Sequence, residues 1–126
     1  MNSKNHYLKV FRVVFYILLS LSSYLSLQPI HTPDSPLFWD KLWHTITHFT
    51  LFVFLDRGFS PNKHLAVKAL ALLIYGLIIE VIQRFLPYRT FSLRDLAANI
   101  LGLVLYFLIR NWLARVQNIK VSHSKN

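Results

Sequence analysis

The stretch YGLIIEVIQRFLPYRTFSLRDLAANILG, residues 75–102, decides the fold because it places charged side chains between two strongly apolar segments. Residues 65–86 and 93–113 each have the length of about 20 residues that a helix needs to cross a hydrocarbon core. Pro87 is a stop signal for the first segment, and Ser92-x-x-Asp95 resembles a capping box for the second, with Asp in place of Glu. The stretch therefore predicts two transmembrane helices joined by a short loop.

Two further apolar segments precede this stretch. Residues 10–30 have spanning length, and their basic flank would also suit a cleaved signal peptide. No A-x-A-like cleavage site follows, so we favour an uncleaved span. Residues 36–57 are apolar only in their second half and could form a soluble amphipathic helix when taken alone, but their place between other spans favours a fourth span. Ser35 would be its N-cap and Pro36 its first helical residue.

The chain is thus predicted to be all-α, a compact bundle of four transmembrane helices running up-down-up-down. Residues 1–113 would form one membrane domain, and the polar tail at 114–126 is expected to be disordered. Only 15% of the 126 residues are charged, against roughly 25% in soluble domains, which agrees with lipid as the solvent. The absence of cysteine excludes disulfides, thiolate metal sites and cysteine nucleophiles.

The net charge of +9 is segregated by side of the membrane rather than arranged as a stripe, so we expect no nucleic-acid partner. With both termini in the cytoplasm, the inner side carries ten basic residues and the outer side four, as the positive-inside rule requires. The ten are Lys4, Lys9, Arg12, Arg57, Lys63, Lys68, Arg110, Arg115, Lys120 and Lys125. The four are Lys41, Arg84, Arg89 and Arg94.

Polar side chains gather at the predicted outer ends of three helices and in the outer loop. Asp40 and His44 are four residues apart and share one helix face, as do Asp95 and Asn99. We predict a water-accessible pocket at this end of the bundle. Its candidate ligand-binding residues are Asp40, Lys41, His44, Glu80, Gln83, Arg89, Ser92, Asp95 and Asn99.

These residue types suggest roles, each with a structural alternative. Arg89 is suited to a phosphate or carboxylate, and its alternative is snorkelling to the headgroups. Glu80 is an expensive intramembrane carboxylate and therefore a functional candidate, although an interhelical salt bridge would also explain it. Asp95 could simply favour a helix N-terminus.

Catalytic residues are not identified; His44, oriented by Asp40, is the candidate proton carrier. His48 is interpreted as a hydrogen-bonded packing residue, and we expect no metal and no cofactor. No serine elbow, P-loop or H-E-x-x-H motif supports an enzyme.

Three motifs resemble the signatures of VanZ-like membrane proteins: DKLWH from Asp40, EVIQRFLPYR from Glu80 and SLRDLAANILG from Ser92. They occur in order over about half of the chain. The resemblance implies a small protein of the bacterial cytoplasmic (inner) membrane. Because the founding member is linked to teicoplanin resistance, it also implies a role at the cell envelope.

The sequence thus supports binding of an anionic or amphiphilic envelope molecule, with membrane lipids, a lipid-linked cell-wall precursor or a glycopeptide as candidates. Two alternatives stay open, a membrane enzyme that modifies an envelope lipid and a structural accessory subunit without a ligand. The oligomeric state does not follow from the sequence.

Overall fold

The computed structural model of the protein describes residues 3–29 and 37–123, and all the regular structure within them is helical. The all-α prediction is therefore confirmed for the described residues. The helices are α1 (Ser3–Leu27), α2 (Leu37–Gly58), α3 (Leu65–Arg84) and α4 (Leu93–His123). The predicted capping role of Ser35 and Pro36 lies outside the described residues.

Prolines and tight turns set the helix ends. α1 stops at Leu27, short of the predicted residue 30, because Pro29 disfavours a helical conformation at Gln28. α3 ends at Arg84 in a tight turn before Pro87, where the Phe85 N–H donates to the carbonyl of Ile82 over 3.0 Å. Both ends therefore follow from the restriction that proline places on its neighbours.

The prediction that the polar tail is disordered is wrong for most of its length. α4 continues past residue 113 to His123 without a break. The added segment, ARVQNIKVSH, contains neither proline nor glycine, the two residues that disfavour a helix most. The polarity of this segment indicates where the helix leaves the apolar layer. It does not indicate where the helix ends.

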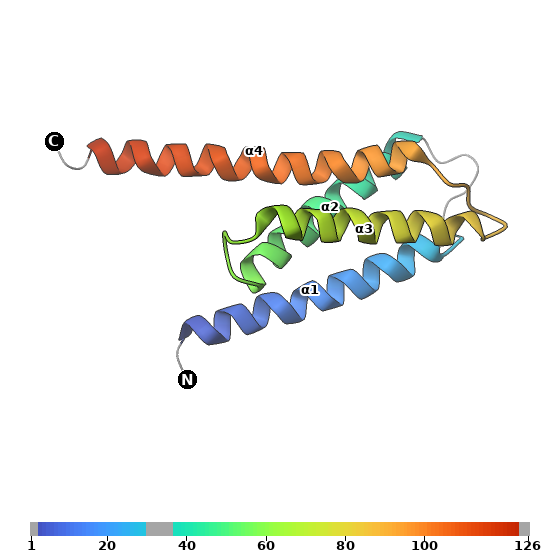
Figure 1. Ribbon diagram of the computed structural model, residues 1–126, viewed down its shortest axis with the longest axis horizontal. Helices are drawn as coiled ribbons and strands as arrows, with labels where there is room; N and C mark the ends of the chain where they lie inside the picture. The colour runs from blue at the N-terminus through green and yellow to red at the C-terminus, as the bar shows by residue number, and fades with distance from the viewer. Residues whose placement is uncertain (1–2, 30–36, 124–126) are drawn as a thin grey trace.

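α2 is the central helix of the bundle. It packs against α1, α3 and α4, and its interfaces with α4 and α1 are the largest in the molecule. Figure 1 shows α1 and α3 running in the same direction, with α4 opposed to them. We call the end where α1 and α3 finish and α2 and α4 begin the Arg89 end, and the other the Asp56 end.

The α2–α4 interface depends on a close approach of the two backbones. A Cβ on Gly102 of α4 would collide with the carbonyl oxygen of Thr45 on α2 and lie 3.0 Å from the Phe49 backbone nitrogen. About one turn away on α4, the Thr45 hydroxyl donates to the Ala98 carbonyl over 3.1 Å. The small residues Ala98 and Gly102 are therefore buried in this interface, whereas the neighbouring Ala97 is exposed.

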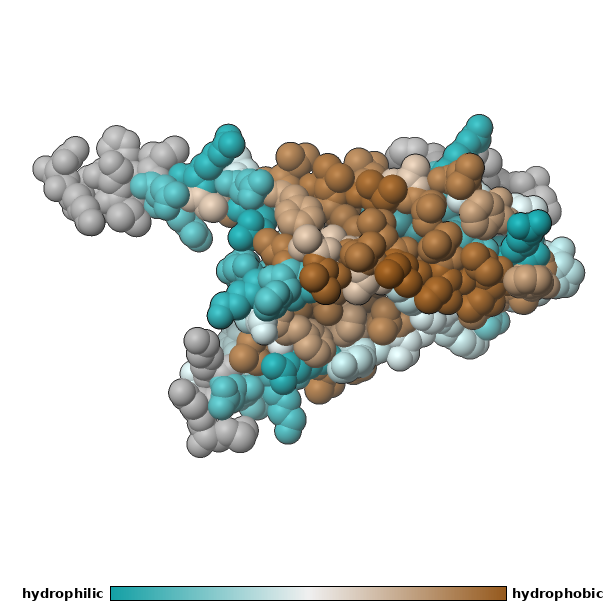
Figure 2. All heavy atoms as spheres, viewed as in Figure 1, coloured by the Kyte–Doolittle hydropathy of each residue, from teal (hydrophilic) through white to brown (hydrophobic). Residues whose placement is uncertain are grey.

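Three helices are long and apolar enough to cross a membrane: α1 over Asn5–Leu27, α3 over Leu65–Arg84 and α4 over Leu93–Asn118. α2 is not among them, because its first half is polar. Hydrophobic side chains cover the middle of the face in Figure 2, and hydrophilic ones gather toward its two ends. The surface therefore has the layered polarity that a bilayer requires.

Candidate functional site

An ion cluster joins the beginnings of α2 and α4 at the Arg89 end. The Lys41 ammonium group pairs with Asp40 Oδ2 at 3.0 Å and with Asp95 Oδ1. All three side chains are largely shielded from solvent. Asp95 therefore does more than favour its own helix N-terminus, since it holds α2 against α4.

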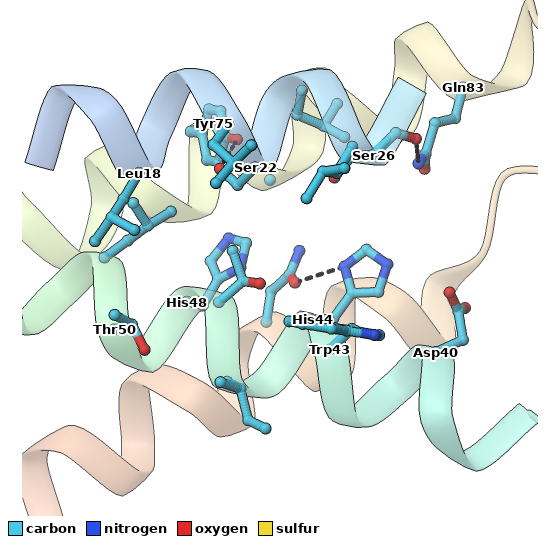
Figure 3. Close-up of a pocket in the computed structure, with 18 of the residues that line it drawn as sticks. Leu18, Ser22, Ser26, Asp40, Trp43, His44, His48, Thr50, Tyr75 and Gln83 are labelled. Carbon is cyan, nitrogen blue, oxygen red and sulfur yellow. Dashed lines mark hydrogen bonds between the residues drawn. The ribbon is translucent and has the colours of Figure 1, made fainter. Parts of the chain in front are cut away.

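His44 links the same two helices one turn deeper. Its Nδ1 atom lies 3.1 Å from Asn99 Oδ1 (Figure 3), and its Nε2 atom lies 3.7 Å from Asp95 Oδ2. The structure thus brings together Asp40, His44, Asp95 and Asn99, the two pairs that helical spacing placed on common faces. Because His44 faces Asn99 with one nitrogen and Asp95 with the other, its ring orientation is fixed by α4.

Glu80 is fully buried in α3 and connects it to the start of α4. Its Oε2 atom accepts a hydrogen bond from the Ser92 backbone N–H at 3.1 Å, whereas Oε1 has no hydrogen-bond partner among the described residues. In a capping box the acceptor for this N–H would be Asp95. The predicted box is therefore wrong on this point: Glu80 of α3 accepts the bond, because the shorter Asp95 side chain turns to Lys41.

The end of α3 and the loop after it cap the end of α1. Gln83 Nε2 donates to the Ser26 carbonyl at 2.7 Å, the Tyr88 hydroxyl to the Leu27 carbonyl at 3.0 Å, and an Arg89 Nη atom to the Gln28 carbonyl at 3.2 Å. The last carbonyls of a helix have no partner within it, and a cation there also complements the helix dipole. Gln83 and Arg89 thus have a structural role in addition to any contact with a ligand.

A cavity of about 390 Å³ lies beside these groups. It runs between the halves of α1 and α2 that are nearer the Arg89 end, with α3 and one residue of α4 closing it (Figure 3). This volume lies within the range of small-molecule sites, about 300–1,000 Å³. Of the candidate residues, those that line it are Asp40, His44, Gln83, Arg89 and Asn99. Those that do not are Lys41, Glu80, Ser92 and Asp95.

The cavity is closed on one side and open on the other. The lining residues of α3 and α4 that face it, such as Gly76, Ile79 and Asn99, are buried. The lining residues of α1 and α2 include Leu25 and Trp43, which are 41% and 63% exposed. The open side therefore lies between two apolar helix surfaces, where lipid would be the surrounding solvent.

One group of residues has the composition of a metal site. Asp40, His44 and Asp95 each offer a ligand atom, and these atoms lie within 4.8 Å of one another. The ammonium group of Lys41 pairs with both carboxylates and supplies positive charge to the cluster. The ion pairs account for the arrangement by themselves, and the expectation of no metal stays a prediction.

Two features were not anticipated from the sequence. The interpretation of His48 as a hydrogen-bonded packing residue is wrong on the hydrogen bond: the residue is buried and lines the cavity, but neither of its ring nitrogens has a partner among the described residues. At the Asp56 end, Asp56 accepts hydrogen bonds from Lys68 Nζ at 2.7 Å and from the Tyr106 hydroxyl at 2.7 Å. A lysine within an apolar segment was the available signal, since such a residue needs a buried partner.

Comparison with known proteins identifies the family to which the chain belongs. Residues 3–114 match the VanZ/LLP1 family. The chain belongs to the VanZ/LLP1 family. The resemblance read from the three motifs is confirmed, and the apolar helices of this VanZ/LLP1 protein identify it as a membrane protein.

A fungal relative extends the comparison without adding an activity. The VanZ/LLP1 chain is 34% identical over 101 residues to "Uncharacterized protein C11E3.10" of Schizosaccharomyces pombe. The match covers 76% of this chain and 59% of the relative, so the chain spans little more than half of the curated relative it matches. No solved structure matches the chain.

Proposed function

We propose that this VanZ/LLP1 protein binds an anionic, amphiphilic envelope molecule in the cavity at the Arg89 end. One observation carries the proposal: a cavity with apolar walls contains a cationic side chain whose hydrogen-bonding capacity is only partly used. Arg89 donates to the Gln28 carbonyl, but its buried Nε atom has no partner among the described residues. A buried donor without an acceptor is costly, and phosphate or carboxylate oxygens are the acceptors that arginine binds best.

The surroundings support an amphiphile more than a small soluble anion. The cavity opens between α1 and α2, so a ligand with an apolar part could stay in contact with the bilayer. Lys41 is already paired with Asp40 and Asp95, which leaves Arg89 as the main cationic contact for the ligand. Asn99 and Asp40, which also line the cavity, would take hydrogen bonds from amide or hydroxyl groups of the headgroup.

The cellular setting is part of the same proposal. The cavity would face the outer leaflet of a bacterial cytoplasmic membrane. Four helices would cross this membrane, and both chain termini would lie inside, because the basic residues concentrate at the Asp56 end and near the two chain termini. Membrane lipids, lipid-linked cell-wall precursors and glycopeptides are the candidate ligands. A link to teicoplanin resistance would follow from occupancy of such a site, and the teicoplanin susceptibility of a deletion strain tests it.

Native mass spectrometry of the purified protein tests the binding itself. Phosphatidylglycerol, phosphatidylcholine and diacylglycerol with identical acyl chains would be offered in equal amounts. We expect the wild type to retain phosphatidylglycerol preferentially and Arg89→Gln to lose that preference.

The control must separate ligand binding from the capping of α1. Tyr88→Phe removes a neighbouring cap on the Leu27 carbonyl without changing charge, so it should leave the headgroup preference intact. Equal retention of the three lipids by the wild type would refute the proposal. Loss of preference in Tyr88→Phe as well would assign the effect of Arg89 to the shape of α1.

A structural accessory role is the second candidate, and the interhelical contacts favour it. Glu80 binds the start of α4, and Lys41 joins α2 to Asp95. If these contacts are the whole purpose of the cluster, their loss should lower the thermal stability in detergent, and no lipid should raise it. A rise in the melting temperature of the wild type with phosphatidylglycerol, but not with phosphatidylcholine, would count against this candidate.

The enzyme alternative has weaker support. His44 faces Asn99 and Asp95 with its two nitrogens, which suits a positioning role better than a free general base.

A further inference from the structure

His48 is the deep polar group of the cavity, and it has no hydrogen-bond partner among the described residues. The residue is 3% exposed, and both Nδ1 and Nε2 are buried. The carbonyls of His44 and Leu72 lie near the ring but outside hydrogen-bonding geometry. Buried polar groups in native proteins are almost always hydrogen-bonded, so an unpartnered imidazole on a cavity wall calls for an explanation.

Glycines on two helices make room for this ring. A Cβ on Gly76 of α3 would lie 2.9 Å from His48 Nε2, and a Cβ on Gly102 of α4 would lie 3.1 Å from His48 Cβ. Figure 3 shows the ring pointing from α2 toward α1, into the space between them. The ring is therefore held at the cavity wall by close backbone packing and does not lie there loosely.

Three other polar side chains near this depth satisfy one another. The Tyr75 hydroxyl lies 2.9 Å from Ser22 Oγ and 3.0 Å from Ser23 Oγ. Both serines donate to the Leu19 carbonyl. Among these neighbouring groups, His48 is thus the one that still needs a partner.

The position of His48 sets the depth of that partner. His48 lies four residues, or about 6 Å by helical rise, below His44 on the same face of α2. The headgroup site of the proposed function lies at the level of His44 and Arg89. A ligand that satisfies both levels has an anionic group and, roughly one helical turn deeper, a second polar group at the start of its apolar part.

We propose that the ligand is a diacylglycerolipid with an anionic headgroup, and that His48 recognises an ester carbonyl of its acyl chains. This inference rests on the proposed function and narrows its ligand class. The phosphate would contact Arg89, and a neutral imidazole N–H would donate to the ester carbonyl. The acyl chain would leave through the open side, past Leu25 and Trp43.

The ester carbonyl distinguishes anionic diacylglycerolipids from another class of anionic lipid, the polyprenyl phosphates. A polyprenyl phosphate also has an anionic group on an apolar chain, but below its phosphate it has only hydrocarbon. It would leave His48 without a partner, at the cost of an unmade buried hydrogen bond. The cavity should therefore select against the lipid carrier of cell-wall precursors.

A comparison of ester-linked and ether-linked lipids tests the inference on the wild-type protein. The probes are phosphatidylglycerol with ester-linked chains, its ether-linked analogue with the same chains, and a polyprenyl phosphate. One hydrogen bond of ordinary strength corresponds to a preference of about threefold to tenfold. We expect the ester lipid to bind about that much more tightly than the ether lipid, and the polyprenyl phosphate to bind more weakly than the ester lipid.

Variants assign the preference to His48. His48→Phe keeps an aromatic ring beside Tyr75 and should bind the ester and ether lipids equally, while its preference for an anionic headgroup persists. Thr47→Val is the matched control, because it removes a hydroxyl from the same stretch of cavity wall and should keep the ester preference.

The outcomes separate this inference from the proposed function. Equal binding of ester and ether lipids by the wild type, with anionic lipids still preferred, would overturn the inference alone. Tighter binding of the polyprenyl phosphate would do the same. Loss of any preference for anionic headgroups would overturn both. The wild-type comparison decides the matter even where His48→Phe does not fold.

Discussion

Asp56 accepts hydrogen bonds with both of its carboxylate oxygens. It is fully buried at the end of α2, and its two oxygens accept from Lys68 Nζ, the Tyr106 hydroxyl and the Asn62 backbone N–H. Lys68 donates in addition to the Ser60 carbonyl at 2.9 Å. A buried ion pair compensates its desolvation only when its remaining hydrogen-bonding groups are also satisfied, and here they are. The cluster therefore ties α2, α3, α4 and the α2–α3 loop together.

Removing the charge of Asp56 should be strongly destabilising. Asp56→Asn keeps the shape of the side chain but leaves the Lys68 ammonium group buried without a counter-ion. Breaking a buried pair in this way costs about 3–5 kcal/mol of the free energy of unfolding. The measurement is thermal or denaturant unfolding in detergent, followed by circular dichroism.

The neighbouring Arg57 provides the control, because it is exposed and lies on the same helix turn. Arg57→Gln should change the stability little. Similar stability of Asp56→Asn and Arg57→Gln would mean that the Asp56 cluster is solvated and does not hold the bundle.

Single residues differ in how far the sequence reveals their surroundings. The contacts among Asp40, His44, Asp95 and Asn99 follow from a spacing of four residues and a shared depth, which sequence alone supplies. The pairing of Asp56 with Lys68 and Tyr106 does not, because it depends on how the α2–α3 loop folds. Ser60 and Asn62 in that loop, and His64 at the start of α3, adopt positive φ angles. No turn motif in the sequence predicts them.

At the scale of elements, the end of α1 depends on another part of the chain. The carbonyls of Ser26, Leu27 and Gln28 are bound by side chains from the end of α3 and the loop after it. α1 thus ends in caps that reach it from about sixty residues further along the chain. The shape of the cavity mouth follows from this, because the same contacts place Gln83 and Arg89.

Gln83→Leu should loosen the last turn of α1 without unfolding the bundle. It removes one neutral hydrogen bond, worth about 0.5–1.5 kcal/mol, while keeping the side-chain volume. Hydrogen exchange measured by mass spectrometry should show faster exchange in the peptide that contains residues 22–28, by about twofold to tenfold.

Arg84→Gln changes the exposed residue next to Gln83 and should leave that exchange unchanged. Unaltered exchange in Gln83→Leu would show that the other two caps suffice to hold the end of α1.

The helices themselves were largely predictable, and the exceptions have physical causes. Apolar length locates α3 and the end of α1 to within a few residues, and Pro87 marks where α3 stops. The continuation of α4 to His123 was missed because polarity marks where a helix leaves an apolar layer, which is not where its backbone hydrogen bonding stops.

At the scale of the whole molecule, the direction of the helices constrains their topology. α1 and α3 run the same way (Figure 1), so the chain must return across the full thickness of the bundle between them. α2 makes that return, although its composition does not mark it as a span. Charge asymmetry predicted an orientation, but no pattern in the sequence indicated that the helix least recognisable as a span would be the central one.

Single cysteines can test this topology because the chain has none of its own. Thr90→Cys, in the exposed loop at the Arg89 end, should react with a membrane-impermeant maleimide in intact cells. Lys63→Cys and Arg115→Cys, also exposed and on the other side, should react only after permeabilisation.

A cysteine between α1 and α2 decides whether α2 crosses, because Lys63 and Thr90 flank α3. Pro29→Cys, which is also exposed, should react in intact cells as Thr90→Cys does. Protection of Pro29→Cys together with Lys63→Cys would mean that α2 does not cross the bilayer. Labelling of Lys63→Cys and Arg115→Cys in intact cells would contradict the proposed orientation altogether.

The central place of α2 has a consequence for how the protein is made. With Asp40, Lys41, His44, His48 and Asp56 along it, α2 has little tendency to partition into lipid by itself. Its partners Lys68 and Asn99 belong to segments that the ribosome synthesises later. If α2 crosses the bilayer as proposed, its commitment to the membrane must wait for them, so synthesis order and insertion order differ. A nascent chain ending at Gly58 should accordingly anchor through α1 alone and leave α2 open to added protease.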